Sequence, residues 1–384
     1  MASPSADLGR REPRLWQRIR GVSWGLVLLI CAAACFGIAV LYSAADGNME
    51  PWAAKQTMRF AIALILMVGA ALVDIRHWFR AAYWVYAIML ALVVAVDLRG
   101  FVGMGAQRWI DLGMIQLQPS ELMSVAVVLA LARYFHALSD EDVGRFPYLI
   151  LPALMIIVPT ALVLKQPDLG TAIMLLMGGA VLFFVAGVRL RLFLLTAAAA
   201  AAALPGVWHF LREYQKNRIY TFLDPDSDPL GAGYHILQSK IALGSGGLFG
   251  KGFLHGSQSH LSFLPEKQTD FIFTTLAEEF GLVGGLGLLA LYILIIAYGF
   301  AIALGCRNHF GRLLGLGIIT NFFLYVFINT AMVMGLIPVV GVPLPLISYG
   351  GTAMLAVMLG FGLLINVGVH RDTRLNRSGE RRPG

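Results

Sequence analysis

Charged residues are scarce in this chain, making up 13% of its 384 residues, where a typical soluble domain has about 25%. Hydrophobic residues make up 58%. This balance excludes an ordinary soluble domain and is typical of a chain that lies mostly in lipid. The net charge of +7 does not indicate nucleic acid as a partner, because most arginines flank apolar segments and no nucleic-acid-binding motif is visible.

Cysteine is equally rare. Cys31 and Cys35 lie inside one apolar run, and Cys306 lies in a short connection. This spacing fits neither a disulfide framework nor a metal site, so we expect three small core residues. The first apolar run, 22–45, exceeds the roughly 7–15 residues of the hydrophobic segment of a signal peptide, so it predicts an uncleaved span.

What the sequence has in abundance is apolar runs of spanning length. They predict an all-α integral membrane protein of about ten transmembrane helices. The runs cover roughly 22–45, 57–73, 81–98, 120–138, 148–164, 170–187, 192–210, 274–304, 313–334 and 351–368. The predicted organisation is a basic tail (1–21), a polytopic membrane domain (22–368) and a second basic tail (369–384).

Arginines are unevenly divided between the two sets of connections. The connections on the side of the membrane that holds both chain ends carry most of the arginines, and the connections on the opposite side carry few. Basic residues concentrate on the cytoplasmic side of membrane proteins, so both termini are predicted to be cytoplasmic. The alanine run 197–203, inside the seventh span, is expected to allow close helix packing.

A long connection, 211–271, separates the seventh and eighth predicted spans. Connections of this length without a function are uncommon. On the predicted topology it is extracytoplasmic, and it is partly structured, because 234–243 has the pattern of a short amphipathic helix on the membrane surface that ends at Gly244.

Within this loop, SGGLFGKG (245–252) superficially matches a phosphate-binding P-loop. The first glycine and the final Ser or Thr of that motif are replaced by Ser245 and Gly252, so no nucleotide site is expected. The glycines instead predict tight turns and close backbone approach, and Lys251 is left as a candidate contact for an anionic group.

Asp270, in FLPEKQTDFIF (263–273), has two interpretations from its position. It could cap the eighth helix by accepting backbone N–H bonds. Alternatively, it is a general base facing a cavity at the outer membrane surface. Nearby basic residues are either solvated surface charges or ligands for a lipid-linked phosphate, with Arg218 the best candidate for a forked contact; the others are Lys240, Lys251 and Lys267.

Other polar residues recur at the outer ends of the predicted spans. Asp168 could cap the sixth helix or contact substrate, and Glu121 lies in the first turn of the fourth, where a carboxylate has a structural role. The proline- and glycine-rich segment 343–351 predicts a rigid, non-helical stretch of backbone leading into the tenth span. Such a stretch must be buried in protein or line a cavity. Further candidate substrate contacts are Arg108, Trp109, Glu266, Ser348 and Tyr349.

Six stretches together identify a family. RWIDLG, QPSEL, QPDLGT, the FLDP to GLFGKG segment, FLPEKQTDFIF and GLIPVVGVPLPLISYGGT resemble the SEDS family of bacterial cell-wall proteins, and the last is closer to its RodA branch than to its FtsW branch. The resemblance runs from about Trp24 to Asn366. It implies a peptidoglycan glycosyltransferase of the bacterial inner membrane that polymerises lipid II during cell elongation and rod-shape maintenance.

The resemblance also implies a mechanism and partners. Asp270 matches the essential aspartate of the family, its candidate catalytic base, and Trp109 matches a position of functional importance. The implied transfer is inverting, with Mg²⁺ or Mn²⁺ as a candidate cofactor and no dedicated metal cage in the chain. The implied partners are a class B penicillin-binding protein and the elongation machinery.

Two departures and two alternatives accompany this assignment. The family commonly has Lys three residues after the Glu of QPSEL, where this chain has Ser124, and many members have His where this chain has Gln268. The alternative functions are a lipid II flippase and a scaffold for the penicillin-binding protein. Polar residues concentrate at the outer end, with Asn321 and Asn329 as deep exceptions, which favours the transferase.

Overall fold

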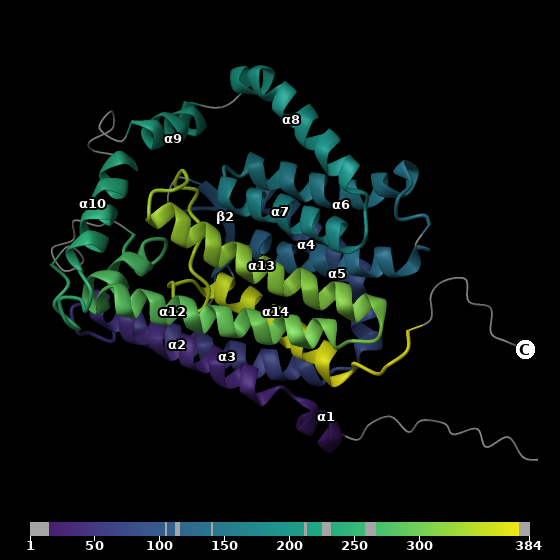
Figure 1. The fold of residues 1–384 in the computed structure, drawn as a ribbon, viewed down its shortest axis with the longest axis horizontal. Coiled ribbons are helices and arrows are strands. Elements are labelled where there is room, and N and C mark those ends of the chain that lie inside the picture. The colour runs from purple at the N-terminus through teal and green to yellow at the C-terminus, as the bar shows by residue number, and fades with distance from the viewer. Residues whose placement is uncertain are drawn as a thin grey trace, which may run out of the picture.

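The computed structural model describes residues 15–103, 106–111, 116–139, 141–210, 213–224, 232–257 and 266–375. Long helices run alongside one another in an elongated bundle (Figure 1). The predicted apolar segments correspond to α2 (Trp24–Ala44), α3 (Ala53–Leu72), α4 (Ile75–Arg99), α5 (Pro119–Ala137), α6 (Phe146–Lys165), α7 (Leu169–Val185), α8 (Leu190–Phe210), α12 (Ile272–Leu304), α13 (His309–Val333) and α14 (Gly351–Val369).

Eight of these helices are long and apolar enough to span a membrane. The two that fall short are α7, with 17 residues, and α8, whose apolar part is Leu190–Ala203. The chain is therefore a largely helical multi-pass membrane protein, as predicted, while the count of ten spans stays a prediction. The two predicted tails lie partly outside the described residues, and the first contains helix α1 (Leu15–Gly21).

The centre of the bundle is formed by α5, α13 and α14. Two thirds or more of each is buried, whereas most of α4 faces outward. Most of their buried apolar side chains belong to one continuous core, and a few from α13 form a small second cluster with α7. At Gly362 a side chain would lie 2.6 Å from the carbonyl oxygen of Met67, so the absence of one lets α14 pack directly on the backbone of α3.

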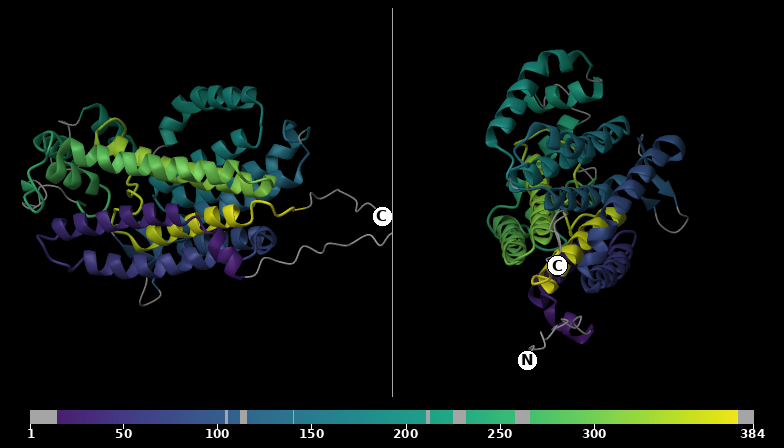
Figure 2. Two further views of the ribbon diagram at one scale, coloured as in Figure 1. Left: turned by 60° about the horizontal axis from the view of Figure 1, so that its bottom comes forward. Right: turned by 90° about the vertical axis from the view of Figure 1, so that its right-hand side faces the viewer.

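Helix α8 lies apart from the rest of the bundle (Figure 1 and Figure 2). Its alanine run, 197–203, is exposed, so the prediction that this run packs closely on another helix was wrong. A purely apolar alanine surface can face lipid tails without a protein partner, because nothing in it needs a hydrogen bond.

A small antiparallel sheet connects α4 to α5 and was not predicted. Its strands are β1 (Phe101–Gly103), β2 (Ala106–Asp111) and β3 (Gln116–Leu117). Trp109 lies opposite Phe101, and Ile110 lies opposite Leu117. The strands are too short for an alternating pattern to be recognised in sequence. They hold Arg108 and Trp109 at the end of the bundle.

The long loop contains two helices, α9 (Glu213–Leu223) and α10 (Ala232–Ser245). The predicted helix at 234–243 is confirmed in α10, which is two residues longer at each end. Its inner face packs on the bundle through the buried Ser239, whose hydroxyl lies 2.9 Å from that of Thr274 and donates to the carbonyl oxygen of Val333 at 2.8 Å.

The glycine-rich segment that follows α10 docks into a kink of α12. The kink is at Gly281, which has φ 65° and ψ −162°. Four backbone hydrogen bonds of 2.9–3.1 Å join the two segments. The amides of Lys251 and Gly252 donate to the carbonyl oxygens of Glu278 and Glu279. In the other direction, the amides of Leu282 and Val283 donate to those of Gly247 and Leu248. At Gly250 a side chain would lie 2.0 Å from the carbonyl oxygen of Glu279. The predicted close backbone approach is confirmed.

Candidate active site

Asp270 lies in the turn that precedes α12. The N-cap residue of that helix is Phe271, and no side chain makes a capping hydrogen bond there. Within the described part of the chain, the Asp270 carboxylate has no hydrogen-bonded partner. The capping hypothesis for Asp270 is therefore wrong, and its carboxylate is available for another role.

The backbone around Asp270 is held firmly in place. The amide of the fully buried Asn329 donates to the carbonyl oxygens of Asp270 at 2.8 Å and Val342 at 2.7 Å. At Gly341, with φ 76°, a side chain would lie 3.3 Å from Oδ2 of Asp270. Asn329, one of the two deep polar residues, thus joins α13 to both segments that border the carboxylate.

The segment 343–351 supports the same turn. The Ser348 hydroxyl donates to the carbonyl oxygen of Thr269 at 2.6 Å and accepts from the amide of Leu344 at 2.7 Å. The amide of Tyr349 donates to the carbonyl oxygen of Gln268 at 2.8 Å. The predicted rigid entry is confirmed, and the hydroxyl of Ser348 is engaged in positioning the turn.

Burial raises the pKa of Asp270 from its usual 3.8 to about 6. This value of about 6 already includes the neighbouring carboxylates of Glu266 and Asp168, which raise the pKa, and the guanidinium groups of Arg218 and Arg108, which lower it. Asp270 is thus a carboxylate that is ionised at neutral pH and more basic than an ordinary aspartate, which is the tuning that a general base needs.

Arg108 and Asp168 are fixed by neighbouring motifs. The Arg108 guanidinium donates to the carbonyl oxygens of Gln166, at 3.2 Å, and Pro167. Asp168 caps α7, as predicted, accepting from the amide and hydroxyl of Thr171 at 3.2 and 3.0 Å. It also accepts from the Gln118 amide at 3.0 Å. Asp168 is buried, so its role here is to hold the site together.

The other predicted cations lie elsewhere. Lys251 forms an ion pair with the fully buried Glu278 at 2.7 Å, which the sequence analysis had not assigned as its partner. Lys267 is buried beside the Trp52 ring, at 6.0 Å, and burial lowers its pKa while the charge of Asp46 raises it. Lys240 is exposed and lies against Gly335. The structure therefore brings only Arg108 and Arg218 of the predicted cations to Asp270.

Three comparisons with known proteins agree on the family. Residues 22–373 match the model of the FtsW/RodA/SpoVE family, described as cell cycle proteins. The chain is 46% identical over 350 residues to the peptidoglycan glycosyltransferase MrdB of Escherichia coli K12, covering 90% of this chain and 93% of that protein.

The chain belongs to the FtsW/RodA/SpoVE family.

Solved structures of this family have the same fold. One is a chain of a peptidoglycan synthase complex described as coordinating polymerization and crosslinking. It matches with a TM-score of 0.81 and 34% identity, and the match covers 92% of this chain and 99% of that one. Another is RodA of Thermus thermophilus, with a TM-score of 0.69 and 30% identity over 92% of this chain and 98% of that one. The resemblance inferred from the six sequence stretches is confirmed.

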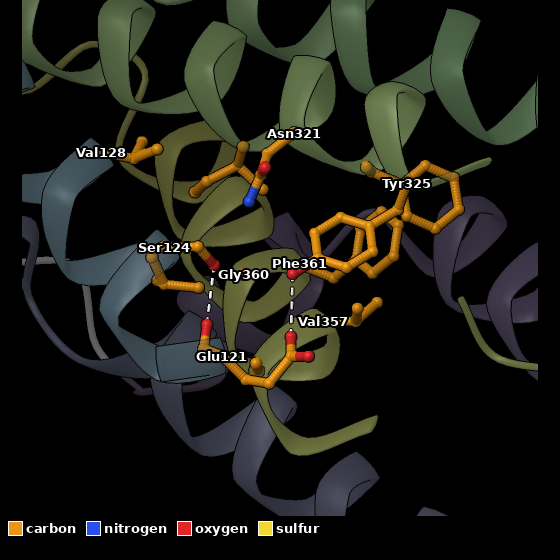
Figure 3. Close-up of a pocket in the computed structure, with 12 residues that line it drawn as sticks. Glu121, Ser124, Val128, Asn321, Tyr325, Val357, Gly360 and Phe361 are labelled. Carbon is orange, nitrogen blue, oxygen red and sulfur yellow. Dashed lines mark hydrogen bonds between the residues drawn. The ribbon is translucent and has the colours of Figure 1, made fainter. Parts of the chain in front are cut away.

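Glu121, which lacks the family's common lysine, has a different partner. Tyr325 donates its hydroxyl to Oε2 of Glu121 at 2.8 Å. The Ser124 hydroxyl instead donates to the backbone oxygen of Glu121 at 2.7 Å. Figure 3 shows these groups with Asn321 around an internal cavity of about 30 Å³, which is room for a water molecule and too small for a sugar.

Arg59 was not among the site residues predicted from the sequence. Its guanidinium lies over the Tyr349 ring, 4.6 Å from the centroid, and beside Gly351 at the start of α14. The available signal was a lone arginine in the first half of an otherwise apolar span, where a charge is costly unless it is used. Tyr349 thus connects the turn that holds Asp270 to a fixed cation.

Proposed function

We propose that this chain is a peptidoglycan glycosyltransferase that polymerises lipid II into β-1,4-linked strands at the outer face of the cytoplasmic membrane. The observation that carries the proposal is the uncapped, partly buried Asp270 carboxylate, whose pKa is raised to about 6 and which has two arginines close by. Family membership, and the names of relatives such as MrdB, support the same activity.

The proposed reaction is one inverting displacement. Asp270 accepts the proton of the acceptor 4-hydroxyl as that oxygen bonds to the anomeric carbon of the donor. The bond from that carbon to the diphosphate breaks, and the diphosphate leaves with the electron pair. It needs charge stabilisation rather than a proton, and this is the role proposed for Arg218 and Arg108, both close enough to Asp270 to lower its pKa.

A divalent cation, Mg²⁺ or Mn²⁺, is proposed to arrive on the diphosphate. Among the described residues, no group of three or more His, Cys, Asp or Glu side chains is arranged to hold a metal ion. Magnesium often binds through substrate phosphates and only one or two carboxylates. Asp270 is assigned to the proton of the acceptor, so Glu266, which is close enough to Asp270 to raise its pKa, is the acidic residue that fits such an ion. When bound, the cation would neutralise charge on the leaving group.

The proposed location is the bacterial inner membrane, with both termini cytoplasmic, which follows from the distribution of arginines. The proposed partner is a class B penicillin-binding protein of the elongation machinery. Support comes from the similar chain that was solved within a peptidoglycan synthase complex.

The deciding experiment gives the purified chain lipid II and Mg²⁺, with and without a class B penicillin-binding protein. We expect glycan polymer on a gel. Failure to form polymer even with the partner would reject the transferase. A fluorescent lipid II translocation assay in vesicles would then test the flippase alternative.

The rate should depend on pH through Asp270. Because the base must be ionised, kcat/KM is expected to fall below a midpoint near pH 6. Arg218→Gln removes a charge that lowers this pKa, so its midpoint should move to higher pH and its KM for lipid II should rise. Arg191→Gln, at an exposed arginine distant in the chain, serves as the control. A wild-type profile that is flat from pH 5 to 8 would contradict the assignment.

A further inference from the structure

An open groove lies at the end of the bundle that carries both chain termini, opposite Asp270. Its volume is about 1300 Å³, larger than the roughly 300–1000 Å³ of a usual small-molecule site. It lies between the end of α1, the start of α4, the end of α12 and the end of α14. Its lining includes Ser23, Asp74, Arg76, Ile302, Val369 and Arg374.

The walls of the groove are fixed by hydrogen bonds. Asn366, near the end of α14, donates to the carbonyl oxygens of Ala70 and Ala71 at 3.1 and 3.0 Å. On the other side, the amide of Arg307 donates to the carbonyl oxygen of Arg371 at 3.0 Å. The groove is therefore formed before any ligand binds, which lowers the entropic cost of binding.

Positive charge exceeds negative charge around the groove. Arg76, Arg371 and Arg374 line it, together with Asp74 and Asp372. Both aspartates pair with arginines that do not line it: Asp74 with Arg18 at 3.4 Å, and Asp372 with Arg307 at 3.3 Å. Asp372 also pairs with Arg371 at 3.6 Å. Leaving Arg76 aside, four described arginines thus accompany two carboxylates, so an anion would complete the charge balance.

The groove lies at the ends of spanning helices, a position that corresponds to headgroup depth if these helices cross a bilayer. Trp16 and Trp24 are exposed beside it, on α1 and α2, and Leu304 is exposed at the end of α12. Tryptophan is enriched where the hydrocarbon region of a bilayer meets water. Tyr298, Ala301, Ile302 and Val369 provide an apolar lining. A ligand with an anionic head and an apolar body fits this combination better than a free anion.

We propose that this groove binds the phosphate headgroup of an anionic phospholipid, with Arg371 and Arg374 as its principal contacts and the apolar lining against the glycerol and upper acyl chains. The segments 1–14 and 376–384 each contain more arginines than acidic residues, so neither complements the charge of the groove. On the proposed topology the lipid belongs to the inner leaflet. Binding does not depend on the transferase activity.

The test is a titration of the full-length chain in detergent with phosphatidylglycerol, followed by native mass spectrometry and thermal unfolding. We expect one or two retained phosphatidylglycerol molecules and a higher Tm, and neither effect with phosphatidylcholine. Each arginine near an anionic headgroup is worth about five-fold in affinity. Arg371→Gln with Arg374→Gln should therefore weaken binding about 25-fold.

Two controls separate this site from general surface charge. Arg189→Gln with Arg191→Gln removes two exposed arginines, one just before α8 and one in its first turn, and it should leave binding unchanged. Asp372→Asn removes a competing carboxylate and should tighten binding about five-fold. Inorganic phosphate that displaced the lipid and raised the Tm equally would identify a free phosphate as the ligand. Equal loss in both double variants, or no loss in either, would overturn the proposal.

Discussion

Asp270→Asn is expected to reduce lipid II polymerisation by at least about 100-fold, because a positioned general base contributes on the order of 10²–10⁴ in rate. The asparagine amide has nearly the same shape and cannot accept the proton of the acceptor hydroxyl. Substrate binding by Arg218 and Arg108 does not require the carboxylate, so the loss should appear in kcat more than in KM. Initial rates at several lipid II concentrations would check this.

The same substitution should not unfold the chain. Burial raises the pKa of Asp270 to about 6 from 3.8, so the folded state binds a proton more tightly than the unfolded state does. The ionised carboxylate therefore costs stability, and this cost grows as the pH rises from about 4 to 6. At pH 7.5 the Tm of Asp270→Asn should equal or exceed that of the wild type.

A matched control is Glu213→Gln, at an exposed carboxylate of the same long loop, which should keep full activity. An Asp270→Asn protein that is folded and fully active would reject Asp270 as the base. Glu266 would then be the next candidate, since Glu278 is fully buried and bound by Lys251 and Ser257.

Gly250→Ala is expected to destabilise the chain by about 3 kcal/mol or more, with loss of activity. Its φ is 81°, which costs an alanine about 1–2 kcal/mol. The new side chain would also lie 2.0 Å from the backbone oxygen of Glu279. Because that contact is with backbone, the glycine-rich segment must move, and the hydrogen bonds that join it to α12 are lost.

Substitutions at two other glycines separate the cost of a positive φ from the cost of the close contact with Glu279. Gly247 also has a positive φ, 56°, but a side chain there meets nothing within 4 Å, and Gly244 has neither constraint. The Tm should therefore fall most for Gly250→Ala, less for Gly247→Ala and little for Gly244→Ala. Thermal unfolding in detergent measures this order. Equal Tm values for the three variants would contradict the docking of this segment into the kink.

Much of the site was predictable from local pattern. Asp168 begins α7 as a cap because aspartate is a preferred N-cap residue, and its carboxylate accepts from the backbone amide of Thr171 three residues later. Short stretches of distinctive sequence identified the family, and the family resemblance in turn predicted Asp270 as the candidate catalytic base. Sequence alone left two roles open for Asp270, because capping depends on backbone geometry at a single residue.

The partners of the charged residues were decided by tertiary structure. Lys251 and Lys267 were candidate phosphate contacts alongside Arg218, yet Lys251 is bound to Glu278, and Lys267 lies beside Trp52. Glu121 is paired with Tyr325, 204 residues away along the chain. Such pairings depend on which helices become neighbours, and helical periodicity carries no information on that.

The order of the residues alone was enough to identify a multi-pass membrane protein, to locate most of its helices and to assign its family. Lipid requires every backbone group to be satisfied within a helix, so the length of an apolar run alone specifies a span. Tertiary contacts, in contrast, leave Asp270 uncapped, bring two arginines near it and form a basic groove at the opposite end of the bundle. Each of these depends on contacts between segments far apart in the chain, whose geometry is set by packing.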